Sequence, residues 1–225
     1  MKIFITGIDT DSGKSIVTGL IAKYLKNNEQ TVITQKYVQT GCTNIAEDII
    51  THRQLMGVDL LEEDILQITC SYLFKHPASP HLSAKMEDIQ INSQLFTDAT
   101  KILEKDYEYV LMEGAGGLMV PLNSQTLLID YIQGQNYPVI LVSSSKLGSI
   151  NHTLLSLEIL KNRKMNVIGV VYNQYPNLDK SIIEDSENII KKHLKIYFPE
   201  AGFISIPKIN LDKAPILNFN KILQA

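Results

Sequence analysis

The stretch with the clearest chemistry runs from Gly7 to Ser15 and reads Gly-Ile-Asp-Thr-Asp-Ser-Gly-Lys-Ser. A phosphate-binding loop has glycine, four residues and Gly-Lys-Ser/Thr; its backbone N–H groups surround phosphate oxygens, its lysine reaches the β/γ oxygens and its hydroxyl binds Mg²⁺. Here five residues separate Gly7 from Gly13, one more than in that pattern. Because an apolar run precedes the loop and helical spacing follows it, the stretch predicts a phosphate-binding loop at a helix N-terminus. The alternative is an ordinary glycine-containing turn.

Two further charged residues follow runs with strand character. Lys36 follows the β-rich run 31–35, and we expect it at the carboxyl end of that strand, facing the phosphate loop. Glu113 ends the apolar strand 109–112 and precedes Gly114-Ala115-Gly116-Gly117, where backbone can approach a ligand closely. An acid in that position can orient Mg²⁺. The alternatives are a solvated surface lysine and a glycine-rich turn with a solvated acid.

Polar residues at two other strand ends have both a functional and a structural interpretation. Asn173 ends the apolar run 167–172, and its amide can either contact the edge of a base or form a turn. Ser149 or Asn151 is expected to cap the next helix, whose N-terminus can receive a carboxylate or be an ordinary capped end. The histidines, His52 among them, have no metal-ligand spacing.

Composition limits the classes of partner and compartment. The chain has 225 residues, 44% of them hydrophobic, which is enough for a sizeable core, and we expect one domain over residues 1–225. A net charge of −3 from 21 basic and 24 acidic residues creates no global field that would recruit nucleic acid or an anionic membrane. Cys42 and Cys70 lack metal-ligand spacing, which is typical of reduced thiols in a cytoplasmic protein. No signal peptide or membrane span is expected.

Strand-like and helix-like segments alternate along the chain. This order predicts an α/β fold: a mostly parallel, doubly wound sheet flanked by helices. The two prolines of segment 77–81 indicate a rigid connection in place of a helix or central strand. Strands are expected at 3–5, 31–35, 109–112, 138–142 and 167–172, and helices at 16–25, 44–57, 60–68, 93–105, 154–160 and 181–197.

Taken together, the motifs resemble those of the dethiobiotin synthetase family of phosphate-loop proteins. The resemblance implies an ATP- and Mg²⁺-dependent cyclo-ligase of biotin synthesis, which joins CO₂ to the diamine 7,8-diaminopelargonate. It also implies a homodimer with sites near the subunit interface. Ser15 stands where the family usually has threonine, and Tyr37 where proline usually follows the catalytic lysine. The matching segments span nearly the whole chain in the family's order: Gly7 to Ser15, Lys36 with Thr40-Gly41, Ser79 to His81, Glu113 to Gly117, Lys146 to Gly148 with Ile150 to His152, and Asn173.

The same resemblance implies a role for each matching residue. Lys14 would hold the β/γ-phosphates, and Lys36 would face the carbamate and the γ-phosphate as the second catalytic lysine. Ser15, Asp48 and Glu113 would bind Mg²⁺. Substrate contacts would come from Thr10, Thr40 and Gly117, and from the helix start at Ser149, Ile150 and Asn151, contributed by the partner subunit. The remaining nucleotide contacts would come from Asp11, Ser12, Gly13, Ile16, Gly114, Ala115 and Gly116, with Asn173 and Pro207 at adenine.

Two other functions use a similar loop. A partitioning-type ATPase switch dimerises around ATP and binds a protein partner, but such switches carry a lysine five residues before the Lys-Ser lysine, where this chain has Asp9. A degenerate family member would bind nucleotide without turnover, and Tyr37 is the feature that favours it. The presence of Lys14, Lys36 and Glu113 favours the ligase.

Overall fold

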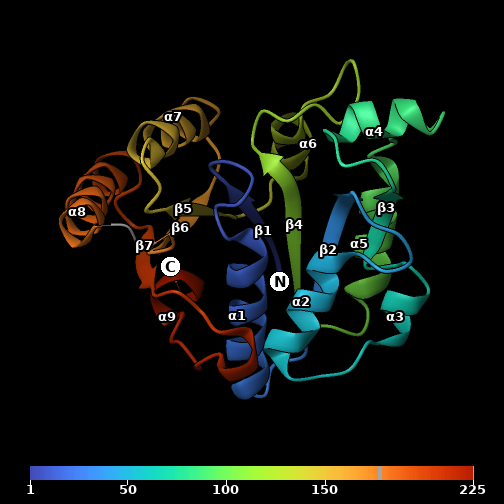
Figure 1. The fold of residues 1–225 in the computed structure, drawn as a ribbon, viewed down its shortest axis with the longest axis horizontal. Helices are drawn as coiled ribbons and strands as arrows, with labels where there is room; N and C mark the ends of the chain where they lie inside the picture. Colours follow the sequence, from blue (N-terminus) through green and yellow to red (C-terminus); the bar gives the residue numbers. More distant parts are fainter. Residues whose placement is uncertain (177–178, 225) are drawn as a thin grey trace.

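A seven-stranded sheet forms the centre of the protein in the computed structural model, which describes residues 1–176 and 179–224 (Figure 1). The strand order is β3-β2-β4-β1-β5-β6-β7, and the neighbouring strands pair in parallel. Parallel neighbours need crossover connections, and these bring helices to both faces of the sheet. The predicted doubly wound α/β fold is confirmed. The strands are β1 (Lys2–Gly7), β2 (Val32–Thr40), β3 (Cys70–Phe74), β4 (Tyr109–Gly117), β5 (Val139–Ser144), β6 (Val167–Asn173) and β7 (Gly202–Ile206).

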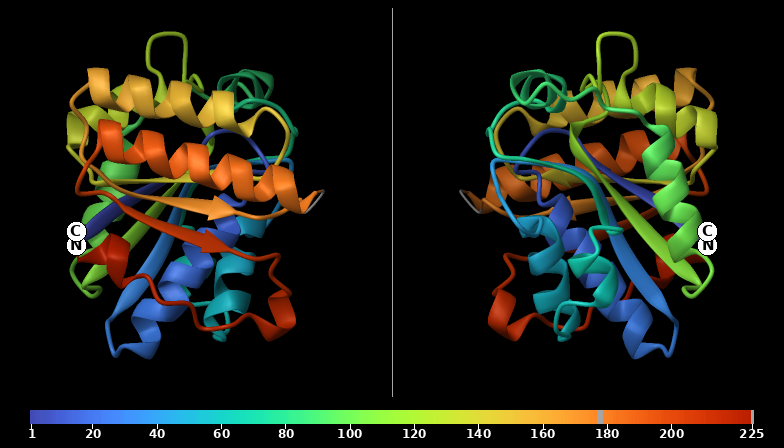
Figure 2. Two further views of the ribbon diagram at one scale, coloured as in Figure 1. Left: turned by 90° about the vertical axis from the view of Figure 1, so that its left-hand side faces the viewer. Right: turned by 90° about the vertical axis from the view of Figure 1, so that its right-hand side faces the viewer.

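The helices form two layers around the sheet (Figure 2). One face carries α1 (Lys14–Asn27), α2 (Glu47–Met56) and α9 (Asn220–Leu223), whose apolar residues pack with Ile3 and Ile5 of β1. The other face is covered by α5 (Gln94–Leu103), α6 (Leu128–Gln135), α7 (Ser149–Asn162) and α8 (Lys180–Tyr197), around Phe4 of the same strand. Burial on both faces explains why the central strands are continuous apolar runs. The shorter helices are α3 (Glu62–Ile65), α4 (Pro80–Met86) and the 3₁₀ turn η1 (Leu211–Lys213).

β2 and β4 extend furthest beyond their predicted ends, and this changes the position of the charged residues. β2 continues to Thr40, so Lys36 lies inside the strand and not at its carboxyl end. β4 continues through Glu113 to Gly117, because its glycines pair with β1 at Gly7. Lys36 and Glu113 are register partners on adjacent strands. Pairing with neighbours therefore overrides the weak strand preference of glycine.

The segment between β2 and β4 differs most from prediction. The helix expected at 44–57 begins at Glu47 and ends where Gly57 adopts φ 65°. The helix expected at 60–68 is only the single turn α3, and the edge strand β3 that follows it was not predicted, nor was α6. The rigid connection predicted for residues 77–81 ends at Ser79, because helix α4 begins at Pro80. Proline is tolerated there because the first residue of a helix needs no backbone N–H.

The predicted cap of α7 was also wrong. Gly148, at φ 93°, is the N-cap residue, and no side chain caps the helix. The Ser149 hydroxyl instead shares a hydrogen bond of 3.0 Å with the hydroxyl of Ser144 at the end of β5. A glycine reaches this left-handed conformation without strain, so it replaces the side-chain cap as the means of turning the chain into the helix.

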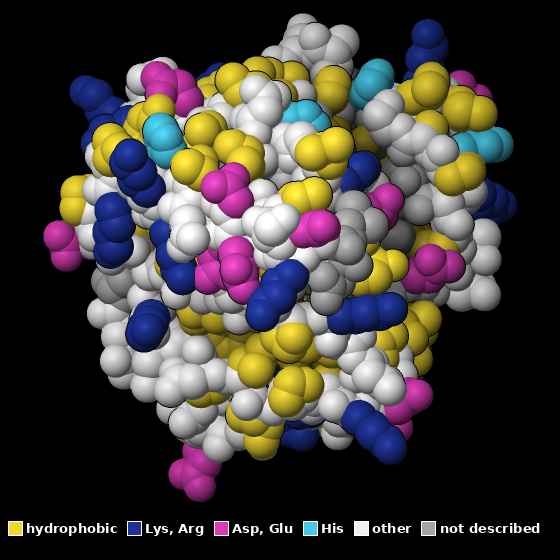
Figure 3. All heavy atoms as spheres, turned by 60° about the vertical axis from the view of Figure 1, so that its left-hand side comes forward, with side chains coloured by type: hydrophobic (Ala, Val, Ile, Leu, Met, Phe, Trp, Pro, Cys, Tyr) yellow, Lys and Arg dark blue, Asp and Glu magenta, His cyan; other side chains and the backbone are white. Residues whose placement is uncertain are grey.

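Among the described residues, no helix has the length and apolar character needed to cross a membrane. The face shown in Figure 3 carries lysine, arginine and acidic side chains interspersed with apolar ones. This distribution agrees with a chain whose basic and acidic residues are nearly balanced.

Candidate active site

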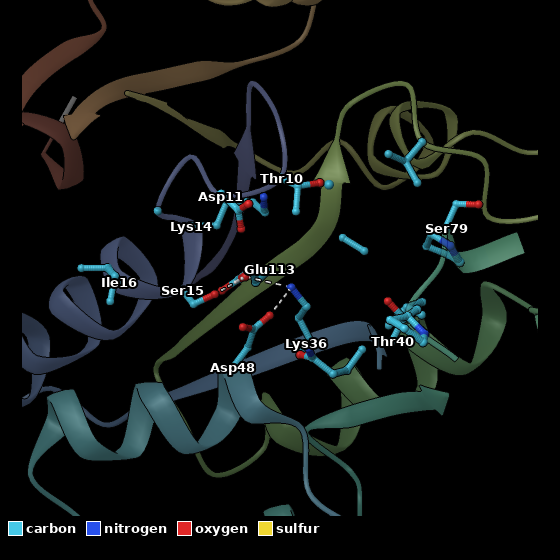
Figure 4. Close-up of a pocket in the computed structure, with 18 of the residues that line it drawn as sticks. Thr10, Asp11, Lys14, Ser15, Ile16, Lys36, Thr40, Asp48, Ser79 and Glu113 are labelled. Carbon is cyan, nitrogen blue, oxygen red and sulfur yellow. Dashed lines mark hydrogen bonds and ion pairs between the residues drawn. The ribbon is translucent and has the colours of Figure 1, made fainter. Parts of the chain in front are cut away.

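A pocket of about 890 Å³ opens where β1, β2 and β4 end above the N-terminus of α1 (Figure 4). This volume lies within the range of small-molecule and cofactor sites. Its floor is the loop between β1 and α1, and its walls come from β2, the start of α2, the Pro77–Pro80 segment and β4. Ligands of open α/β sheets bind at this edge, outside the carboxyl ends of the strands.

The loop is held in a conformation that only glycine allows at its last position. Gly13 is the N-cap residue of α1 with φ 98°, and an added Cβ would lie 2.4 Å from Asn173 Nδ2. The Asn173 side chain donates to the Ser12 carbonyl at 3.2 Å, which ties the end of β6 to the loop. The first turn of α1 has no acidic residue, so its free N–H groups and positive dipole end favour an anion.

A buried cluster of charges lies beside the loop (Figure 4). Glu113 Oε1 accepts hydrogen bonds from Lys36 Nζ at 2.8 Å and from Ser15 Oγ at 3.0 Å, and Lys36 Nζ lies 2.5 Å from Asp48 Oδ2. Burial alone would lower the pKa of Lys36, but the carboxylates of Glu113 and Asp48 outweigh it and raise that pKa. Burial alone would raise the pKa of Glu113, but Lys36 and His52 hold it well below its usual range. Both groups are therefore charged at neutral pH.

Lys14 differs electrostatically from Lys36. Its ammonium donates to the Asp9 carbonyl at 2.9 Å, within the loop itself. Burial and the charge of Lys36 lower the pKa of Lys14 to about 8, because the attraction of Glu113, Asp48 and Asp11 does not compensate for them. A buried cation that lacks a close carboxylate partner favours binding of an anionic phosphate group, which would compensate its charge.

The donor set at this cluster fits Mg²⁺. Ser15 Oγ and Glu113 Oε1 are 3.0 Å apart, and Asp48 contacts the Lys36 ammonium that Glu113 also contacts, so three side chains with hard oxygen atoms surround this part of the pocket. No group of three or more His, Cys, Asp or Glu side chains arranged for metal binding is found within the described residues. Two carboxylates with one hydroxyl suit Mg²⁺, which keeps waters and takes further oxygens from substrate phosphates.

Comparison with known proteins identifies the family. A family model described as an AAA domain matches residues 1–206. ATP-dependent dethiobiotin synthetase BioD 2 of Pasteurella multocida is 50% identical over 200 residues, which cover 89% of this chain and 94% of that protein. ATP-dependent dethiobiotin synthetase BioD of Chlorobaculum tepidum is 46% identical over 212 residues, covering 94% and 89%. This chain belongs to the dethiobiotin synthetase family.

Solved structures with the same fold are more distant. The cell division protein FtsY of Thermotoga maritima matches with a TM-score of 0.55 and 14% identity, covering 100% of this chain and 67% of that one. A ParA family ATPase of Chlorobium tepidum matches with a TM-score of 0.53 and 15% identity, covering 92% and 84%. At this identity the likeness shows a common fold alone, and it gives the partitioning-type switch no support beyond the fold.

The residues to which the family resemblance assigned roles fall into two groups. Those that line the pocket are Thr10, Asp11, Gly13, Lys14, Ser15, Ile16, Lys36, Thr40, Asp48, Glu113, Ala115, Gly116 and Asn173. Those that do not line it are Ser12, Gly114, Gly117, Ser149, Ile150, Asn151 and Pro207. Ser12, Gly114 and Gly117 are neighbours of lining residues, and Pro207 follows Ile206, the register partner of the lining residue Asn173. The start of α7 lies beside the end of β5, where Ser149 contacts Ser144.

Tyr37, where the family usually has proline, does not disturb the backbone at Lys36. β2 is regular from Val32 to Thr40. The Tyr37 ring lies on the face of the sheet that α5 covers, stacked on Phe96 with ring centroids 4.6 Å apart. Lys36 points to the opposite face and into the pocket. The alternation of side chains along a strand accounts for both placements.

Sequence reasoning missed several residues at the site. Gln39, Val120 and Tyr175 line the pocket, and His52 lies behind Glu113 with its Nε2 2.9 Å from Oε2. Only His52 had a detectable signal: it follows Asp48 by four residues, which places both on one face of α2. Metal-ligand spacing does not reveal His52, because its partner is a carboxylate on β4, far away in the sequence.

Proposed function

We propose that this chain catalyses the ATP-dependent carboxylation and ring closure of 7,8-diaminopelargonate with CO₂, giving dethiobiotin, ADP and phosphate. The proposal rests on family membership and on one observation. Lys14 at the phosphate loop and the cluster of Lys36, Glu113, Asp48 and Ser15 line the same pocket. That arrangement collects cations and magnesium-type ligands where a phosphoryl group would be transferred.

The reaction divides into three steps. A substrate amine adds to the carbon of CO₂ and gives a carbamate. A carbamate oxygen then attacks the γ-phosphorus of ATP, the bond to the β-phosphate oxygen breaks, and ADP leaves. The second amine attacks the carbonyl carbon of the mixed anhydride, the bond to the phosphate oxygen breaks, and the cyclic urea closes with release of phosphate and protons.

The lysines supply the charge that these steps need. Negative charge shifts from the γ-phosphoryl group to ADP and then to phosphate. Glu113 and Asp48 raise the pKa of Lys36, so its ammonium stays protonated and serves as an electrostatic stabiliser and not as a base. Lys14 lacks such a partner and gains one when phosphates enter the loop. Bound to Ser15, Asp48 and Glu113, Mg²⁺ would supply Lewis-acid charge at the phosphate oxygens.

We assign the remaining pocket to the two organic ligands. The adenosine part of the nucleotide would contact Asn173 and Tyr175, which lie on the side of the phosphate loop away from β2. Thr40 and the Pro77–Pro80 segment line the opposite wall and would contact the diamine. The Lys36 side chain lies between the phosphate loop and Thr40 (Figure 4), and would face both ligands.

We further propose a homodimer in which each site is completed by the partner subunit. The pocket of each chain is not lined by its own Ser149, Ile150 and Asn151. Their absence from that pocket agrees with a role in the pocket of the partner subunit. Leu147, just before α7, is 81% exposed, and Leu155 on that helix is 61% exposed. Apolar residues this exposed suit an interface.

We also propose a cytoplasmic location, consistent with the free thiols of Cys42 and Cys70, and a single domain over residues 1–225.

The decisive experiment measures ADP release with Mg-ATP and bicarbonate, with and without 7,8-diaminopelargonate, and identifies the product by mass spectrometry. Diamine-dependent ADP release with the dethiobiotin mass is expected. ATP binding without diamine-dependent turnover would overturn the proposed substrate. To test the shared site, the Lys36→Ala and Asn151→Asp proteins, each expected to be inactive alone, are mixed. Activity that returns on mixing supports a site built by two subunits, and no return contradicts it.

A further inference from the structure

Glu113 has two carboxylate oxygens in different surroundings. Oε1 faces the pocket, where it accepts from Lys36 and Ser15. Oε2 points away from the pocket and lies 2.9 Å from Nε2 of His52. Both the Glu113 and His52 side chains are fully buried. The imidazole is therefore a contact that fixes the orientation of the carboxylate group, with one oxygen directed at the pocket.

His52 makes one hydrogen bond through each of its two ring nitrogens. Glu113 is a carboxylate and can only accept, so the Nε2 atom carries the proton. On the other side, Nδ1 lies 3.0 Å from the Thr34 hydroxyl, which also accepts from Arg53 Nη1 at 2.9 Å. The guanidinium can only donate, so the hydroxyl accepts from Arg53 and its own proton is available to Nδ1. The imidazole therefore carries a proton on Nε2, directed at Glu113.

Arg53 is itself held in place by Asp64. Its Nε and Nη2 atoms donate to the two oxygens of Asp64, each at 2.8 Å, and this bidentate pair is almost fully buried. The Thr69 hydroxyl donates to the same carboxylate at 2.8 Å. A continuous buried chain of hydrogen bonds therefore runs from α3 through α2 and β2 to the pocket.

We propose that His52 is the positioning residue of Glu113, with Thr34 and Arg53 holding the imidazole in place; this rests on the proposed role of Glu113 at the Mg-nucleotide site. The terminal torsion of a glutamate is broad, so a partner on the second oxygen restricts rotation of the carboxylate and keeps the other oxygen directed at Lys36 and Ser15. Asp48 and His52 lie one turn apart on α2. A single helix thus carries one proposed metal ligand and the group that orients the other.

Four substitutions test this arrangement, and the readout is Mn²⁺ affinity in the presence of ADP, measured from the electron paramagnetic resonance signal of free Mn²⁺. His52→Leu fills the space but removes the donor, and we expect a loss of ~10–100-fold, as for other residues that orient metal ligands. His52→Gln can place an amide N–H at the position of Nε2, and should recover most of the affinity. Thr34→Val should weaken binding, whereas Thr34→Ser keeps the hydroxyl and should behave as wild type.

A purely structural role for His52 predicts a different result. It would lower the thermal unfolding midpoint of His52→Leu while Mn²⁺ affinity of the folded protein stays at the wild-type value, and that outcome overturns the proposal. If His52→Leu does not fold, the pair Thr34→Val and Thr34→Ser decides, and equal Mn²⁺ affinity in both overturns it. The assay contains neither diamine nor CO₂, so an error in the proposed substrate would leave these affinities unaffected and appear only in the turnover assay.

Discussion

The buried ammonium of Lys14 makes the stability of the nucleotide-free protein depend on pH in a predictable way. Its pKa falls from 10.5 to about 8 in the folded chain, with burial as the largest cause. Between these values the unfolded chain binds more protons than the folded chain, so the contribution of Lys14 to stability rises with pH. Holding the charged form at pH 7 costs about 3 kcal/mol, and the cost falls to about 1 kcal/mol at pH 9.5.

The perturbation that isolates this effect is Lys14→Met, which keeps much of the side-chain volume and removes the charge. We expect the variant to be more stable than wild type at pH 7, and this advantage to shrink by about 2 kcal/mol at pH 9.5. Other titrating groups are common to both proteins and cancel in the comparison. The assay is urea unfolding of both proteins at each pH, without nucleotide. Lys105→Met, at an exposed lysine, serves as the control and should show no such trend.

An advantage of Lys14→Met that is equal at both pH values would refute the reasoning. It would mean that the ammonium is compensated in the folded state, so that the loop holds no uncompensated charge for a phosphate. The loss of the hydrogen bond from Lys14 to Asp9 does not imitate the effect, because that contact involves a backbone carbonyl and is absent from the variant at both pH values.

Three other substitutions test separate parts of the site. Lys36→Ala should leave ATP binding in calorimetry within about threefold of wild type but reduce turnover by ~10²–10³-fold, as for loss of an electrostatic stabiliser; unchanged turnover would remove Lys36 from the mechanism. Gly13→Ala places a Cβ 2.4 Å from Asn173 Nδ2 at φ 98°, so nucleotide affinity and the unfolding midpoint should both fall, and wild-type values would contradict the strain argument. Arg53→Met should cost ~3–5 kcal/mol in urea unfolding by leaving Asp64 buried and unpaired, whereas Arg53→Met with Asp64→Leu should cost less, and additive losses would contradict that account.

Local sequence patterns predicted the frame of the site. The loop from Gly7 to Ser15 lies between a strand and a helix as expected, because an apolar run, glycines and helical spacing are all local signals. The continuous apolar runs also predicted a buried parallel sheet, since only strands covered on both faces have such runs. From these, the end of the sheet that binds ligand follows as a rule of the fold.

What lay beyond local patterns was decided by pairing between distant strands and helices. Beyond their predicted ends β2 pairs with β3 and β4 pairs with β1, and the pairing of β2 with β4 brings Lys36 and Glu113 side by side. The same contact is why Lys36 is buried and charged, a property that no spacing indicates. His52 acquires its role only when α2 packs against the strand that carries Glu113. The sequence by itself determined which chemical groups are present and which elements carry them; the tertiary structure decided which groups meet, because hydrogen bonds and desolvation depend on distances that only the folded sheet sets.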